Sequence, residues 1–262
     1  MWSYRHQNFT VHQLPALKDN YIYLIDLHNS EILIAVDPAE AVSISNFCTE
    51  RDVRLTHIIN THHHWDHTDG NKALKEKFNA QVIGAADDAH RIPAIDITVS
   101  EHTPPAIDGL NISVLELPGH TSGHVAYLID DALFCGDVLF GAGCGRLFEG
   151  TPSQMWDSLN KLAKLDGKTK VYCAHEYTLP NLRFARTVDP DNDALDQRIH
   201  RDTQTRMDKK PTIPSTIAME MATNPFLRPL DEKFRNHYTG QAKVENDGLT
   251  IFTDLRQRKD RH

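Results

Sequence analysis

Short apolar segments rich in β-branched residues recur through the first two thirds of the chain, and they restrict its fold more than any other feature. Most are 4 to 7 residues long and are separated by glycine or polar residues, which is typical of strands in a sandwich of two sheets. The predicted strands are residues 21–25, 31–36, 54–60, 80–83, 112–117, 125–129, 132–135 and 170–174. With a few helices outside them, these strands predict an α+β fold with four layers in the order αββα.

Two helices can be predicted within this region from local signals. Residues 71–78 form a short helical pattern, for which Asp69 or Asn71 is available as the N-cap. A second helix is predicted to begin at Thr151, which is followed by a proline at the first helical position and by Gln154, the partner of a capping box.

The character of the chain changes near residue 178. From Leu179 onward strand signals nearly vanish, and prolines separate charged segments that have helical patterns. The predicted helices are residues 194–207, 215–222 and 231–238. We therefore predict a main domain at residues 1–178 and a small helical domain at residues 179–262.

Composition excludes several classes of function. The net charge of −8 argues against a general binder of nucleic acid or of anionic membranes. No apolar stretch approaches the roughly 18 residues of a membrane span, and the N-terminus lacks the apolar segment of a signal peptide, so a cytoplasmic location is expected. The four cysteines are scattered, which indicates reduced thiols and no cysteine-based zinc site.

The heptapeptide from Thr61 to His67 follows a predicted strand, precedes a predicted helix and is rich in metal-binding side chains. His62 and His64 are two residues apart in an extended loop, so both can bind one ion, while Asp66 and His67 can reach a second ion. The alternative is a solvated polar loop that happens to be rich in histidine.

Three further loops each place one potential ligand directly after a predicted strand: His120, Asp137 and His175. Taken singly each is weak evidence, because a lone histidine after a strand is more often a hydrogen-bonded loop residue. Together with the heptapeptide they make seven ligands, too many for one tetrahedral ion and suited to two ions. Asp137 is the natural bridge, because a carboxylate has two oxygens.

The order His-x-His-x-Asp-His, Pro-Gly-His-Thr, Cys-Gly-Asp and Ala-His-Glu-Tyr resembles the metallo-β-lactamase superfamily. Within it the chain is most similar to the glyoxalase II family, the hydroxyacylglutathione hydrolases. The motifs that carry this resemblance span almost the whole chain and lie at residues 19–21, 36–38, 61–67, 143–150, 175–178 and 255–260. The implied fold is the four-layer metallo-β-lactamase sandwich with a small helical C-terminal domain.

The resemblance implies two divalent metal ions, with zinc expected and iron or manganese also accepted by these donors. One ion would be held by His62, His64 and His120, and the other by Asp66, His67 and His175. Asp137 would bridge the two ions, and Asp66 and Asp137 would take part in catalysis.

The implied activity is hydrolysis of S-(2-hydroxyacyl)glutathione, chiefly S-D-lactoylglutathione, to glutathione and D-lactate in methylglyoxal detoxification by a monomer. The expected substrate contacts are Arg146, Phe148, Tyr177, Arg256 and Lys259. Phe148 stands where other members have Tyr, so one hydroxyl is missing. Without the resemblance, Arg256 and Lys259 would be interpreted as a solvated helix end.

Neighbouring polar residues receive other interpretations. His63 is expected to point away from the metals, His57 to lie in the core and His124 to support the site from outside the ligand set. Asp37 is expected either to orient a ligand or to end its strand with a turn.

Two rival functions remain. A glutathione persulfide dioxygenase of the same superfamily has a similar heptapeptide and a single iron, but it lacks a C-terminal Arg-x-x-Lys helix. A non-enzymatic zinc module would be expected to have a closed, mostly cysteine site.

Overall fold

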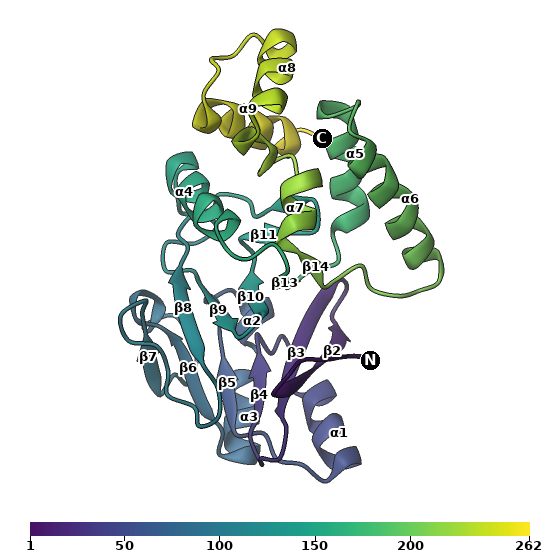
Figure 1. The fold of residues 1–262 in the computed structure, drawn as a ribbon. Coiled ribbons are helices and arrows are strands. Elements are labelled where there is room, and N and C mark those ends of the chain that lie inside the picture. Colours follow the sequence, from purple (N-terminus) through teal and green to yellow (C-terminus); the bar gives the residue numbers. More distant parts are fainter. The chain divides into compact units, whose positions relative to one another are not determined.

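The computed structural model describes all residues from 1 to 262 (Figure 1). The chain forms two compact units, one made of Met1–Glu116 and Ser122–Gly136 and the other of Leu117–Thr121 and Asp137–His262. No helix combines the length and the apolar character that a membrane-spanning segment needs.

The first unit contains a seven-stranded sheet whose strands follow one another in chain order. These are β1 (Trp2–Arg5), β2 (Phe9–Ala16), β3 (Asn20–Leu27), β4 (Leu33–Val36), β5 (His57–Ile59), β6 (Gln81–Ala85) and β7 (Ile97–Val99). The pairs from β1 to β4 are antiparallel and those from β4 to β7 are parallel. A second group of antiparallel strands comprises β8 (Ile112–Glu116), β9 (Val125–Ile129) and β10 (Ala132–Gly136).

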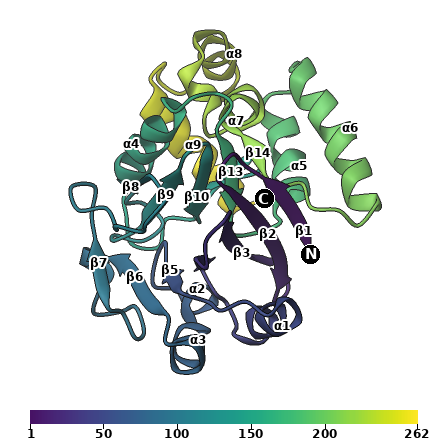
Figure 2. The same ribbon diagram turned by 60° about the horizontal axis from the view of Figure 1, so that its bottom comes forward.

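Both faces of the seven-stranded sheet are covered by apolar side chains. Ile58 of the sheet belongs to one buried cluster with Phe47 of α1 (Val42–Arg51) and Leu74 of α3 (Asn71–Phe78), and these two helices lie outside the sheet (Figures 1 and 2). On the opposite face, the ring of Tyr23 in β3 lies 5.7 Å from that of Phe134 in β10. The two groups of strands therefore face each other across an apolar layer.

The second unit is mainly helical. Its helices are α4 (Pro152–Ala163), α5 (Thr178–Val188), α6 (Asp193–Met207), α7 (Ile217–Thr223), α8 (Glu232–Ala242) and α9 (Gly248–Asp260). Its short strands are β11 (Leu139–Phe140) paired with β12 (Gly143–Cys144), and β13 (Lys170–Cys173) paired with β14 (Ser215–Thr216). Stacked and edge-on aromatic rings of Phe184, Phe226 and Phe252 form part of its core.

The helix boundaries confirm one predicted cap and correct another. The Thr151 side chain accepts a hydrogen bond from the backbone N–H of Gln154. In return, the Gln154 side chain accepts one from the backbone N–H of Thr151, which completes the capping box. The N-cap of α3 is Gly70, with no side-chain hydrogen bond, so the predicted Asp69 or Asn71 cap is wrong. Asn71 is instead buried, and its amide donates to Asn60 Oδ1 and to the carbonyl of Pro93.

Several elements lie outside the sequence predictions. Strands β1 and β2 and helices α1 and α5 were not predicted, and the segment predicted as helix 215–222 begins as strand β14. Pro180 lies in the first turn of α5, where backbone N–H groups have no intrahelical partner, so it does not break the helix.

Candidate metal centre

The loop between β5 and α2 (Trp65–Thr68) places two imidazoles against each other. His62 is fully buried, and its Nε2 atom lies 2.9 Å from His64 Nδ1. The other nitrogen of His62, Nδ1, lies 3.1 Å from the hydroxyl of Thr61, which orients the ring. The ring of His124 stacks on His62 with 4.7 Å between centroids, which supports His62 from the side.

Asp37, directly after β4, holds the beginning of this loop. Its carboxylate accepts hydrogen bonds from the backbone N–H of Thr61 at 2.8 Å and from the Thr61 hydroxyl at 2.7 Å. The same buried carboxylate lies 3.0 Å from His67 Nδ1, which directs the other ring nitrogen away from Asp37. Asp37 therefore orients one of the predicted ligands, in addition to following a strand.

Asp66 is fixed from a distant strand. The side-chain amide of Asn20 donates to Asp66 Oδ2 at 3.0 Å and to the Asp66 carbonyl at 3.2 Å. Asp66 Oδ2 lies 3.7 Å from His67 Nε2, so these two predicted ligands are neighbours.

His63 points to a different partner from the other histidines of the heptapeptide. Its Nδ1 atom lies 3.0 Å from Asp88 Oδ2, and the fully buried Asp88 also pairs with Arg91. The pairing of His63 with Asp88 was not predicted, because nothing in the local pattern around residue 88 signals it.

His120, Asp137 and His175 form a second set of buried ligand-type side chains. The two oxygens of Asp137 face different histidines: Oδ2 lies 3.5 Å from His120 Nε2, and Oδ1 lies 3.4 Å from His175 Nε2. The carbonyl of Arg146 lies 2.9 Å from His120 Nδ1, so Nε2 is the nitrogen directed towards Asp137.

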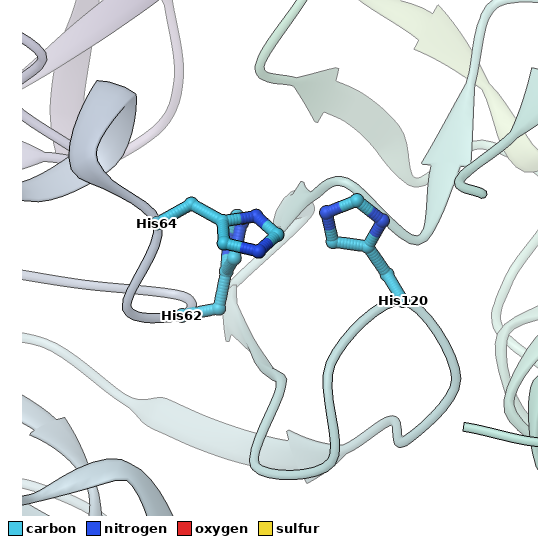
Figure 3. Close-up of side chains that lie close together, drawn as sticks. All are labelled: His62, His64 and His120. Carbon is cyan, nitrogen blue, oxygen red and sulfur yellow. The ribbon is translucent and has the colours of Figure 1, made fainter. Parts of the chain in front are cut away.

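Figure 3 shows the imidazoles of His62, His64 and His120 turned towards one another. One nitrogen from each of these rings lies within 4.8 Å of the others, and so do ligand atoms of Asp66, His67 and His175. Nitrogen and carboxylate oxygen are the donors that zinc, iron and manganese accept. The chemistry of these clusters fits divalent metal ions.

A pocket of about 480 Å³ in the second unit contains all five predicted substrate residues. It is lined by His120, Asp137, Phe140, Cys144, Arg146, Phe148, Tyr177, Pro180, Asn181, Arg256, Lys259, Asp260 and His262. Among these residues, the side chain of Phe148 is 61% exposed to solvent. Cys144 is buried, and burial raises the pKa of its thiol to about 11, so the thiol stays protonated at neutral pH.

The two predicted substrate contacts on α9, Arg256 and Lys259, differ in their surroundings. Arg256 is buried, and its guanidinium donates to the Cys144 carbonyl at 3.0 Å and to Asp260 at 2.8 Å. For Lys259, burial, followed by the positive charges of Arg256, Arg183 and Arg146, lowers the pKa. The charges of Arg146, Arg183 and Arg256 thus all act on Lys259, in a chain whose net charge is negative. Arg183 does not line the pocket, and the sequence prediction did not include it.

Two family models cover most of the chain. The model described as "Metallo-beta-lactamase superfamily" matches residues 50–175, and the one described as "Hydroxyacylglutathione hydrolase C-terminus" matches residues 176–262.

Curated relatives match nearly from end to end. The hydroxyacylglutathione hydrolase of Methylococcus capsulatus is 46% identical over 252 residues, covering 95% of this chain and 96% of the relative. That of Shewanella sp. is 47% identical and covers 96% of this chain and 98% of the relative.

Solved structures agree with the fold. The crystal structure of ETHE1 from Myxococcus xanthus is 26% identical and covers 96% of this chain and 99% of its own, with a TM-score of 0.66. The BLEG-1 B3 metallo-beta-lactamase is 22% identical and covers 83% of this chain and 99% of its own, with a TM-score of 0.63. These likenesses confirm the predicted metallo-β-lactamase fold class.

Proposed function

Because this chain belongs to the hydroxyacylglutathione hydrolase family of the metallo-β-lactamase superfamily, we propose that it hydrolyses the thioester bond of S-(2-hydroxyacyl)glutathione. The main substrate is S-D-lactoylglutathione, and the products are glutathione and D-lactate. The proposed role is in methylglyoxal detoxification.

One observation carries this proposal. The pocket that contains the cations Arg146 and Lys259 is also lined by His120 and Asp137, two of the proposed metal ligands. Glutathione has two carboxylates, so the cations can hold its peptide part while the thioester lies at the metal ligands. Such an arrangement suits a substrate that is anionic at one end and reactive at the other.

The proposed metal centre holds two divalent ions, preferably zinc. His62, His64 and His120 would hold one ion, Asp66, His67 and His175 would hold the other, and Asp137 would be shared. The two distances from Asp137 to different histidines support a shared carboxylate, because each oxygen faces a different ligand set. When bound, two such ions lower the pKa of water and polarise a carbonyl group.

Neighbouring groups fix the orientation of the proposed ligands. Asp37 and the Arg146 carbonyl engage Nδ1 of His67 and His120, which fixes the ring orientation of both. Asn20 holds the Asp66 carboxylate, which would accept a hydrogen bond from the attacking water and aim its lone pair at the thioester carbon.

The leaving group explains why a strong general acid is not required. A thiol has a pKa of about 8.5, so glutathione can depart as a thiolate near neutral pH. Water then supplies the proton after the bond has broken.

The pocket residues divide the binding work. Arg146 and Lys259 would pair with the glutathione carboxylates, while Tyr177 and Phe148 would contact its apolar and peptide surfaces. Arg256 adds positive charge and also fixes the wall of the pocket through the Cys144 carbonyl.

We also propose a functional division near residue 178, with metal hydrolysis assigned to residues 1–178 and glutathione-thioester binding to residues 179–262, although Arg146, Phe148 and Tyr177 line the same pocket from before the division. The junction of the two family models at residues 175 and 176 supports this division. The four free, buried cysteines agree with the proposed reducing, cytoplasmic location, where the chain would act as a monomer.

The decisive experiment measures hydrolysis of S-D-lactoylglutathione by the loss of thioester absorbance, together with the metal content of the same preparation. The proposal predicts turnover and two ions per chain. A preparation with one iron that consumes oxygen with glutathione persulfide, and that leaves the thioester intact, would identify the protein as a persulfide dioxygenase.

A further inference from the structure

The turn between β11 and β12 forms one wall of the 480 Å³ pocket. Phe140 and Cys144, at the two sides of this turn, line the pocket, and Arg146 follows two residues later. The ring of Phe140 packs edge-on against His175 at 5.9 Å and against Tyr177 at 5.3 Å between centroids. The position of this turn therefore sets the surroundings of proposed ligand and substrate residues.

The backbone of the turn is held by three buried side chains. Glu220 Oε2 accepts the backbone N–H of Ala142 at 2.8 Å, and the Asn224 amide donates to the carbonyls of Phe140 at 3.2 Å and Gly143 at 2.9 Å. In addition, the Asn181 side chain donates to the Gly141 carbonyl at 3.1 Å. Each of the four residues from 140 to 143 thus has a side chain bonded to its backbone.

The turn also has little freedom to relax. Ala142 has a φ of +54°, which is in the left-handed region that non-glycine residues adopt at a cost. A Cβ added at Gly141 would lie 2.2 Å from the Thr178 hydroxyl, and one at Gly143 would lie 2.3 Å from Asn181. The turn therefore packs so closely against α5 that it has no room for side chains at Gly141 and Gly143.

Glu220 is itself held by a fully buried cation. Arg198 donates to Glu220 Oε1 at 2.7 Å and to the Thr223 hydroxyl at 2.7 Å, and it pairs with Asp202 at 3.2 Å. Burial alone would lower the pKa of Arg198, but the two carboxylates outweigh burial and raise it. A buried ion pair contributes little net stability compared with apolar packing, so a specific conformation is the better explanation for its presence.

We propose that Glu220, fixed by Arg198, is a positioning residue that sets the 140–143 turn and thereby the wall of the pocket that receives the glutathione part of the substrate. The inference rests on the proposed function. Glu220 is neither a proposed metal ligand nor one of the residues that line the pocket. It acts through the backbone of Ala142 and through Asn224, whose side-chain amide donates to Glu220 Oε2 at 3.0 Å.

The test compares Glu220→Gln with Asp189→Asn, a matched control. Asp189 accepts hydrogen bonds from Arg228 at 3.0 Å and from Asn192 at 2.7 Å in the same unit, and neither partner belongs to the turn. In the wild type, one carboxylate oxygen of Glu220 accepts from Arg198 and the other from the Ala142 N–H. In Glu220→Gln one of these oxygens becomes an NH2 group, which cannot accept, so either Arg198 or Ala142 loses its acceptor. Losing one charge-assisted bond corresponds to a change of about tenfold.

The expected result in Glu220→Gln is a KM for S-D-lactoylglutathione about tenfold higher, with kcat within about twofold and metal content unchanged. The affinity for S-methylglutathione, a thioether that is not hydrolysed, should fall by the same factor in calorimetry. The Ala142 amide should exchange its hydrogen at least about tenfold faster. Asp189→Asn should leave all three quantities as they are in the unsubstituted protein.

If Glu220→Gln does not fold, Asn224→Ser tests the same wall, because it removes the donors to Phe140 and Gly143 and leaves the Arg198–Glu220 pair intact. Unchanged KM and affinity in these variants would overturn the proposal, and so would an equal loss in Asp189→Asn. The proposed function fails separately, when the unsubstituted protein neither hydrolyses the thioester nor binds S-methylglutathione. In that case the exchange rate at Ala142 still decides whether Glu220 holds the turn.

Discussion

At the scale of single residues, Asp137 lies between two other proposed ligands of the candidate metal centre. Its two oxygens lie 3.4 and 3.5 Å from nitrogens of different histidines. Asp137→Asn should lower the metal content and reduce kcat/KM by about 100-fold or more, because a neutral amide is a poor bridge between two cations. Metal analysis and steady-state kinetics check this, and a fully metallated, fully active variant would remove Asp137 from the site.

His63 stands between two proposed ligands in the sequence, but unlike Asp137 it is not expected to bind metal, because it pairs with Asp88. His63→Ala should leave the metal content unchanged. It should lower the free energy of unfolding by about 1–3 kcal/mol, because an oxygen of the buried Asp88 loses its partner. Metal analysis and urea unfolding measure the two effects, with His64→Ala as the variant expected to lose metal. Loss of an ion in His63→Ala would mean that the wrong histidine was assigned.

At the scale of secondary-structure elements, helix α4 shows a purely local origin of stability. The Thr151 hydroxyl accepts a hydrogen bond from the backbone N–H of Gln154, and Thr151 lies on the surface. Thr151→Ala should cost about 1 kcal/mol of unfolding free energy, whereas Thr151→Ser, which keeps the hydroxyl, should cost much less. Chemical unfolding measures both variants. KM and kcat should not change, and a kinetic effect of Thr151→Ala would contradict a role confined to the helix.

Helix α9 is expected to give ligand binding a pH dependence through Lys259. The pKa of Lys259 is lowered by burial, then by Arg256, Arg183 and Arg146, with Asp260 acting in the opposite direction. As the pH rises through this lowered pKa, below the usual 10.5, Lys259 loses its charge and its attraction for a carboxylate. The affinity for S-methylglutathione should therefore fall in that range.

Lys259→Arg is the matched control for this effect, because a guanidinium stays charged over the whole range. Calorimetry on both proteins at increasing pH separates the titration of Lys259 from that of the ligand. Identical pH profiles would show that Lys259 does not bind the anionic ligand.

At the scale of the whole molecule, metal binding should be linked to stability. Ions that bind only the folded chain stabilise it, by about 4 kcal/mol when their concentration is about 1,000 times Kd. Removal of metal with a chelator should therefore abolish thioester hydrolysis and lower the melting temperature, and added zinc should restore both. A melting temperature that does not change on metal removal would contradict a folded-state metal centre built from buried side chains.

The sequence by itself determined the features that depend on short-range patterns. Short apolar segments predicted most strands of both groups, and the Thr151 capping box predicted the start of α4. The candidate ligands were also identifiable, because histidine and aspartate follow predicted strands, and the structure groups His62, His64 and His120 and also Asp66, His67 and His175. Apolar segments, cap chemistry and ligand type each require only a few neighbouring residues.

Only the tertiary structure decided which distant side chains hold these features in place. Asp88 meets His63 across 25 positions of sequence, and Glu220 meets Ala142 across 78. The N-cap of α3 was predicted wrongly because Asn71, a good cap by its chemistry, is bound instead to Asn60 and Pro93. Buried polar groups must find partners wherever the fold brings donors and acceptors together, and a sequence pattern does not record that pairing.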